Sequence, residues 1–144
     1  MFKHILIPTD GSELSKKAMR GGIELAKALG AHITAYACLP QYPYPLFAEA
    51  TIEAPVEFRQ RQESEAHEHL RQVKEAARNE QVPCTSHVSA HASPYLGIIE
   101  AAQVCGCDVI LMASHGRSGL STLLIGSETQ RVLTHTKVPV IVYR

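Results

Sequence analysis

The strongest structural signal in this chain is the segment Val109-Ile110-Leu111-Met112-Ala113-Ser114-His115-Gly116, followed after nine residues by Gly126-Ser127. The apolar run at its start has the length of a buried strand. Gly116 can take a positive φ and lets backbone N–H groups approach a ligand closely. Ser127-Glu128-Thr129-Gln130 fits the S-x-x-Q capping box, so we expect a helix to start at Ser127 with its first amides pointing outward. A strand, a glycine loop and an open helix N-terminus are together typical of an anion site, most often a phosphate site.

The same loop excludes two common phosphate motifs. It lacks Gly-Lys-Ser/Thr, so it is not a Walker P-loop, and G-x-G-x-x-G occurs nowhere in the chain. From the loop alone a second interpretation stays open, in which Gly116, Gly119 and Gly126 only shape a turn.

Strand-like and helical segments alternate along the rest of the chain. Strands are predicted at residues 3–9, 32–39, 83–90, 108–113 and 138–143. Helices are predicted at residues 13–29, 56–81, 94–105 and 128–136. Several strands are apolar at consecutive positions, as sheets covered on both sides require. We therefore expect one α/β domain over residues 1–144, a Rossmann-like open sheet of five parallel strands in the order 3-2-1-4-5 with helices on both faces.

In such a sheet, ligands bind beyond the carboxyl ends of the strands, where the strand order reverses. The segment Pro8-Thr9-Asp10-Gly11-Ser12 and the loop from Ala113 to Ser127 would meet there. Asp10 is one of two aspartates, and the other, Asp108, sits at the opposite end of its strand. Asp10 is either an ordinary turn-former or, as its location favours, an acceptor for a ribose hydroxyl or an adenine amine.

Composition points away from two classes of partner. Fourteen basic residues balance fourteen acidic ones, so no overall field favours nucleic acid or an anionic membrane. The longest apolar runs have the length of strands, so we expect no membrane span. Met1-Phe2-Lys3 leads directly into an apolar strand and leaves no room for a signal peptide, which favours a cytoplasmic location.

The cysteines and histidines indicate no metal or catalytic centre. Cys105 and Cys107 form a C-x-C pair with no second pair at zinc-like spacing, so we expect the four cysteines to be reduced and mainly buried. His67 and His69 lie about 200° apart on a predicted helix and are expected on the surface. His115 alone falls in the loop motif. No nucleophile–base pair is visible, so we assign no catalytic residue.

The loop at residues 39–55 is long for a compact α/β domain and carries three prolines and three aromatic residues. It is either a lid over the ligand or an irregular connection whose aromatic side chains pack on the next helix. We favour the second interpretation.

The last strand, at residues 138–143, predicts a partner. It is apolar throughout, and Pro139 suits a strand at the edge of a sheet. A bare apolar edge is an aggregation hazard unless it is covered. Antiparallel pairing with its own copy across a two-fold axis would cover it, so we expect a homodimer through this strand.

Three segments resemble universal stress proteins at family-like spacing. They are the opening Ile5-Leu6-Ile7-Pro8-Thr9-Asp10-Gly11-Ser12, the ending Thr136-Lys137-Val138-Pro139-Val140-Ile141-Val142, and the glycine loop. The loop resembles the ATP-binding motif of the family's nucleotide-binding branch, G-x2-G-x9-G-[ST]. Ala113 replaces the first glycine of that motif, while Gly116, Gly126 and Ser127 match it. Alanine costs little where φ is negative, so we expect nucleotide binding to survive.

The resemblance implies a site assembled from separate parts of the chain. The nucleoside pocket would be edged by Pro8, Thr9 and Asp10, with Cys38 facing adenine and Met112 and Ala113 beside the base and ribose. The phosphates would be surrounded, chiefly through backbone amides, by His115, Gly116, Arg117, Gly126, Ser127, Glu128 and Thr129.

The resemblance further implies a homodimeric regulatory module of the stress response that binds ATP or AMP, with Mg²⁺ accompanying ATP. Two other functions stay open. One is slow ATP hydrolysis or phosphate transfer to Ser121 or Thr122, with Asp10 as the only strong candidate for a metal ligand. The other is a nucleotide-free dimeric scaffold or chaperone-like module, which Ala113 leaves possible.

Overall fold

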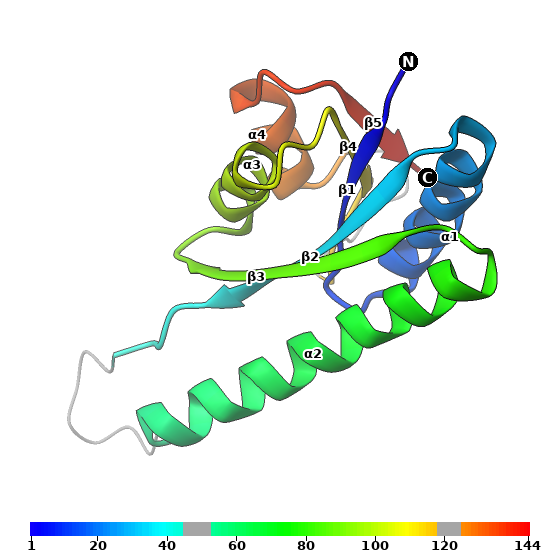
Figure 1. Ribbon diagram of the computed structural model, residues 1–144. Coiled ribbons are helices and arrows are strands. Elements are labelled where there is room, and N and C mark those ends of the chain that lie inside the picture. The colour runs from blue at the N-terminus through cyan, green and yellow to red at the C-terminus, as the bar shows by residue number, and fades with distance from the viewer. Residues whose placement is uncertain (45–52, 118–124) are drawn as a thin grey trace.

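The computed structural model describes residues 1–44, 53–117 and 125–144. Its elements, in chain order, are β1 (His4–Pro8), α1 (Glu13–Leu29), β2 (His32–Pro40), α2 (Pro55–Asn79), β3 (Cys84–His91), α3 (Pro94–Val104), β4 (Val109–Ala113), α4 (Ser127–His135) and β5 (Val140–Tyr143). All four strand pairings are parallel, and the strand order is β3-β2-β1-β4-β5. Figure 1 shows α1 and α2 on one face of the sheet and α3 and α4 on the other. The predicted fold class is therefore confirmed.

The sheet is covered on both faces because its central strands are apolar at most consecutive positions. Ile5 and Ile7 pack in the core layer under α1 and α2, whereas Leu6, between them, packs under α3 and α4. All five residues of β4 are buried. This pattern is the one that a central parallel strand requires, and it leaves only the strand ends free to build a site.

Asp108 aligns β1 with β4 at the amino end of the sheet. Its carboxylate accepts from the backbone N–H groups of Lys3, at 2.8 Å, and His4, at 3.1 Å. These bonds hold the pKa of the Asp108 carboxyl below its usual value. With the amino ends aligned, β1 and β4 end side by side at Pro8 and Ala113, and the two loops that follow meet.

Several element ends differ from the prediction. Strand β5 begins at Val140 rather than at residue 138, because Pro139 has no N–H to donate and contributes only its carbonyl, which accepts from Ile110 N–H. Helix α2 ends at Asn79 rather than at residue 81, where Gln81 takes a positive φ of 59°. Neither difference moves the strand ends at which the candidate site lies.

The loop after β2 packs partly as predicted. Tyr42 lies edge-on against Phe58 of α2, with ring centroids 5.3 Å apart, and its hydroxyl donates to the Glu53 carbonyl at 2.6 Å. Pro45 and Phe47 lie outside the described residues. Over the described ranges, no helix combines the length and apolar character needed to cross a membrane.

Candidate functional site

A cavity of about 560 Å³ opens at the carboxyl ends of β1, β2 and β4. The thirteen residues predicted for the site all line it, namely Pro8, Thr9, Asp10, Cys38, Met112, Ala113, His115, Gly116, Arg117, Gly126, Ser127, Glu128 and Thr129. The strand order explains why. Strand β1 lies between β2 and β4, so the loops that follow these three parallel strands meet at one edge of the sheet. Their role in binding a ligand remains a prediction.

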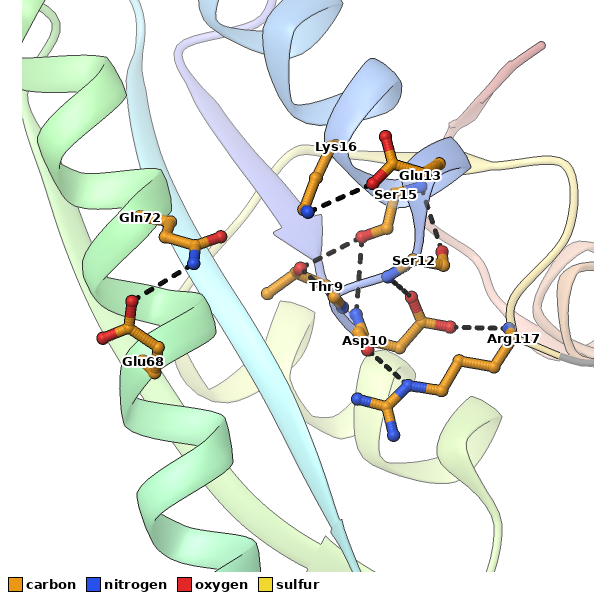
Figure 2. Close-up of polar contacts among 10 residues, drawn as sticks. Thr9, Asp10, Ser12, Glu13, Ser15, Lys16, Glu68, Gln72 and Arg117 are labelled. Atoms are coloured by element: carbon orange, nitrogen blue, oxygen red, sulfur yellow. Dashed lines mark hydrogen bonds and ion pairs between the residues drawn. The ribbon is translucent and has the colours of Figure 1, made fainter.

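Asp10 ties the two loops of the cavity together. One carboxylate oxygen accepts from Ser12 N–H at 2.9 Å, and the other accepts from Arg117 N–H at 3.0 Å. The Arg117 side chain returns the contact, because its Nε donates to the Asp10 carbonyl at 2.6 Å (Figure 2). Asp10 is thus a turn-former that also lines the cavity, and its role as an acceptor for a ribose hydroxyl or an adenine amine stays a prediction. Its carboxylate already has two donors before any ligand binds.

The N-terminus of α1 is closed by its own loop. The Ser12 hydroxyl accepts from Ser15 N–H at 3.2 Å, and the Ser15 hydroxyl donates to Thr9 at 3.0 Å (Figure 2). The first of these contacts satisfies the Ser15 amide, and residues 12–14 do not line the cavity. An anion in the cavity is therefore better placed at another helix.

Helix α4 has an open N-terminus at the cavity. The N-cap is Gly126, in an extended conformation with φ −62° and ψ 154°, and no side chain among the described residues caps this helix. The first helical bond runs from Gln130 N–H to the Gly126 carbonyl, so the amides of residues 127–129 precede the hydrogen-bonded part of the helix. These amides border the cavity and can donate to an anion.

The predicted capping box at Ser127 is wrong. Ser127 is the first helical residue rather than the N-cap, and the N-cap position goes to Gly126. The physical reason lies in the neighbouring strand end, because Gly126 N–H donates to the Ser114 carbonyl at 2.8 Å. A Cβ at Gly126 would lie 3.2 Å from that oxygen, so this tertiary contact places the residue without a side chain at the helix start.

Gly116 is needed for a different reason from the one predicted. Its φ is not positive, whereas Gly11, in the facing loop, has a φ of +78°. A Cβ on Gly116 would lie 2.8 Å from Oδ2 of Asp10, the oxygen that accepts from Arg117 N–H. The glycine therefore permits the close approach of the two loops. Gly119, Ser121 and Thr122 lie outside the described residues.

Thr129 and His115 stabilise the cavity wall from behind. The buried Thr129 hydroxyl donates to the Ala113 carbonyl at 3.0 Å, and Nδ1 of His115, which is 7% exposed, hydrogen-bonds the Ser114 hydroxyl at 3.0 Å. Both side chains therefore form hydrogen bonds with other groups of the protein. The structure thus leaves the backbone of this segment, rather than these side chains, for a ligand.

Glu128 does something that the sequence did not suggest. Its carboxylate accepts from Tyr95 N–H at 2.8 Å, and so caps α3, while its other oxygen accepts from Arg131 at 3.0 Å. Ser93 occupies the N-cap position of α3 but makes no side-chain hydrogen bond there. A carboxylate of the protein therefore occupies the α3 N-terminus, and α4 keeps its amides available.

The β2 wall of the cavity is uncharged. Burial raises the pKa of the Cys38 thiol above its usual value, so the thiol is protonated at neutral pH. The adjacent Tyr36 hydroxyl hydrogen-bonds Ser89 at 2.7 Å, and burial raises the pKa of this phenol as well. The four cysteines are free, and Cys107 is buried while the others are partly buried. No group of three or more His, Cys, Asp or Glu side chains that could hold a metal ion occurs in residues 1–44, 53–117 and 125–144.

Helix α2 supplies a wall that sequence reasoning missed. Gln62, Glu65 and His69 line the cavity, as does Ala66. His67 is exposed as predicted, but the expectation of a surface position for His69 is wrong, because His69 is half-buried and packs directly on Gly11. The sequence feature that indicates this wall is the position of these polar residues beside the apolar face of α2, which contains Leu70 and packs on the core.

Comparison with known proteins gives one family. The model of the universal stress protein family matches residues 1–144. A universal stress protein of Methanocaldococcus jannaschii is 32% identical over 145 residues, which cover 100% of this chain and 83% of the relative.

Solved structures share the fold. That of protein MJ0577 of the same archaeon superposes with a TM-score of 0.83 at 24% identity, covering 99% of this chain and 96% of the other. A universal stress protein from Archaeoglobus fulgidus, solved in complex with dAMP, has a TM-score of 0.72 at 18% identity and covers 100% of this chain and 98% of its own. With a family model that matches from the first residue to the last and a relative this similar along the whole chain, the protein belongs to the universal stress protein family.

Proposed function

We propose that this protein binds an adenine nucleotide, AMP or ATP, in the cavity and acts as a homodimeric regulatory module of the stress response. The observation that carries the proposal is the open N-terminus of α4, whose first amides border a cavity large enough for a nucleotide. The dAMP complex of the Archaeoglobus relative supports the same class of ligand. In this proposal the phosphate lies at residues 126–129.

Regulation would follow from ligand-dependent stability. A ligand that binds only the folded state stabilises it by RT ln(1 + [L]/Kd), which is about 2.7 kcal/mol at a hundredfold excess over Kd. The loops held together by Asp10 and Arg117 would change most, because they contact both each other and the nucleotide. A partner protein that binds these loops only when they are ordered would therefore respond to whether the nucleotide is bound.

The first test is to denature the purified protein and analyse the released small molecules by ion-exchange chromatography. We expect AMP or ATP at about one per chain, or, for protein purified empty, a thermal shift when millimolar AMP or ATP is added. Finding neither a released nucleotide nor a shift would contradict the proposal and favour the nucleotide-free scaffold.

The hydrolytic alternative has less support. Asp10, its candidate metal ligand, already accepts from two backbone amides, and Glu128 already accepts from Tyr95 and Arg131. Mg²⁺ bound with ATP would therefore be held mainly by phosphate oxygens and water, and its role would be to neutralise phosphate charge. The scaffold alternative rests on Ala113, whose φ is not positive, so its methyl group causes no backbone strain.

Glu128 should set how much phosphate charge the cavity accepts. We expect Glu128→Gln to increase the affinity for ATP several-fold more than the affinity for AMP, because the substitution removes a negative charge from the cavity wall and ATP carries more negative charge. Glutamine keeps an acceptor for Tyr95 N–H, so α3 stays capped. Calorimetric titration of both nucleotides at low and high salt measures the effect.

Glu100→Gln is the matched control for that experiment, because Glu100 pairs with His91 and does not line the cavity. The two affinities should not change in this variant. An equal gain for AMP and ATP in the Glu128→Gln variant would show that the carboxylate does not act through phosphate charge.

The homodimer would form through the free edge of β5. Ile110 of β4 and Ser114, which directly follows that strand, donate to the carbonyls of Pro139 and Tyr143, so these two carbonyls face β4. By the alternation of a parallel ladder, the backbone groups of Val140 and Val142 point to the outer edge, where a second copy can pair with them.

We expect Val142→Pro to weaken the dimer at least about tenfold, because it removes an outward N–H while leaving the bonds to β4 in place. Val142→Ala, which keeps the N–H, should remain dimeric. Sedimentation analysis at micromolar concentration separates the two variants. An unchanged dimer in the proline variant, or a wild-type monomer, would rule out pairing through this edge.

A further inference from the structure

Two histidine rings lie against each other at the amino end of the sheet, the end away from the cavity. His4 begins β1 and His32 begins β2, and the two residues are register partners on adjacent parallel strands. Their ring centroids are 3.7 Å apart, with an angle of 31° between the ring planes. Two positive charges at such a distance repel each other even in water, so the rings fit together only while at most one of them is charged.

The His4 ring cannot move away from its neighbour without losing contacts. Its Nε2 hydrogen-bonds the Thr34 hydroxyl at 2.7 Å, and that hydroxyl in turn hydrogen-bonds the Thr85 hydroxyl of β3 at 3.2 Å. Thr34 is 2% exposed, so this bond lies below the surface. The His4 backbone is held as well, because its N–H donates to the Asp108 carboxylate and its carbonyl accepts from the Asp108 N–H. The ring is therefore fixed beside His32.

The groups that face His4 act on its charge in opposite directions. Partial burial and the ring of His32 disfavour the charged form, whereas the carboxylate of Asp108, before β4, and the carbonyl of Gly106, after α3, favour it. Burial and His32 prevail, so the pKa of His4 lies below its ordinary value of 6.5.

The remaining groups at this end do not relieve the repulsion. Lys3 and the amino group of Met1 are exposed and carry positive charge. Burial raises the pKa of the Cys107 thiol to about 12, so no thiolate forms near the rings. The Asp108 carboxylate accepts from the backbone N–H groups of Lys3 and His4, at 2.8 and 3.1 Å, and so is held at the backbone.

We propose that the stacked pair of His4 and His32 is an acid-sensitive element, which destabilises the amino end of the sheet when both rings take up a proton. At His4 the folded protein binds fewer protons than the unfolded chain, because the pKa is lower in the folded state. The stability is therefore complete above pH 6.5 and decreases as the pH falls below this value. The inference goes beyond the proposed function, since it involves no ligand.

The test compares the wild-type protein with His32→Phe, without nucleotide and at one protein concentration. Phenylalanine keeps a ring that can stack on His4 but takes up no proton, and position 32 is exposed, so the fold should accept it. Unfolding in urea at about pH 7.5 and about pH 5 gives the folding equilibrium constant at each pH. We expect this constant to fall at least about threefold more in wild type than in His32→Phe.

His67→Phe is the matched control. His67 is an exposed histidine of α2, whose Nδ1 hydrogen-bonds the Glu63 carbonyl at 2.6 Å, and it lies outside the pair. Its substitution should leave the pH dependence of the wild-type protein unchanged. A second measurement follows the ring protons of His4 by NMR over the same pH range. The midpoint of His4 should rise in His32→Phe, because a neutral ring replaces one that opposes the charge.

Each result decides the inference. A smaller fall of the folding constant in His32→Phe but not in His67→Phe, together with a higher His4 midpoint, supports the acid-sensitive pair. An equal fall in wild type and His32→Phe overturns it, and so does a smaller fall without any change in the His4 midpoint, which would be a structural effect of the substitution.

Discussion

Gly126→Val is expected to weaken the affinity for the nucleotide by about a hundredfold or more, in a protein that remains folded and dimeric. A Cβ at this position would lie 3.2 Å from the Ser114 carbonyl oxygen and 3.3 Å from the Cα of His115. A branched side chain cannot fit there without moving the start of α4 away from the end of β4. The phosphate then loses at least two backbone donors, each worth about 1.5–3 kcal/mol when it bonds a charged group.

Calorimetry with AMP and ATP measures that loss, and circular dichroism checks the fold. Gly126→Ala is the graded control, because its single methyl group needs the neighbours to yield by only a few tenths of an ångström. It should retain part of the affinity. Equal affinity in wild type and Gly126→Val would remove the phosphate site from residues 126–129.

Gly97→Ala is expected to destabilise the protein by about 1–3 kcal/mol, measured as the free energy of unfolding in urea. In an ordinary helix the same change stabilises, because alanine is the better helix former. In α3, however, a Cβ at position 97 would lie 2.1 Å from the hydroxyl oxygen of Tyr36. Tyr36 is 1% exposed and its hydroxyl hydrogen-bonds Ser89 at 2.7 Å, so moving the ring away from position 97 breaks that bond.

The double variant Gly97→Ala, Tyr36→Phe tests the cause. Removing the hydroxyl leaves His91 and Cys38 as the nearest atoms, at 3.0 and 3.1 Å. The alanine should therefore cost at least about 1 kcal/mol less in the Tyr36→Phe background than in wild type. The same cost in both backgrounds would mean that the hydroxyl is not the obstacle.

Much of the candidate site could be predicted because it depends on local spacing. The glycine and serine positions of the loop, and their place after a buried strand, are visible in the chain, and the cavity forms at them. The interpretation failed where a local pattern competed with a tertiary contact. Ser127-x-x-Gln130 fits a capping box, but the bond from Gly126 to Ser114 moves the helix start by one residue.

Contacts between distant segments could not be predicted. Glu128 caps α3 through the N–H of Tyr95, 33 residues before it in the chain, and Asp10 joins Arg117 across 107 residues. No periodicity or motif relates such positions, since each contact exists only after the sheet has formed. For the same reason the sequence does not predict the half-buried position of His69 against Gly11.

The amino-acid order alone determines the alternation of strands and helices, the two-sided burial of the sheet and the strand ends at which a ligand can lie. These features follow from hydrophobic periodicity and backbone preferences, which act over a few residues. Only the tertiary structure decides that the N-terminus of α3 is capped by Glu128, from another helix, while no side chain of the described residues caps α4. It also decides that α2 forms a wall of the cavity, because that depends on the packing of a whole helix across the sheet.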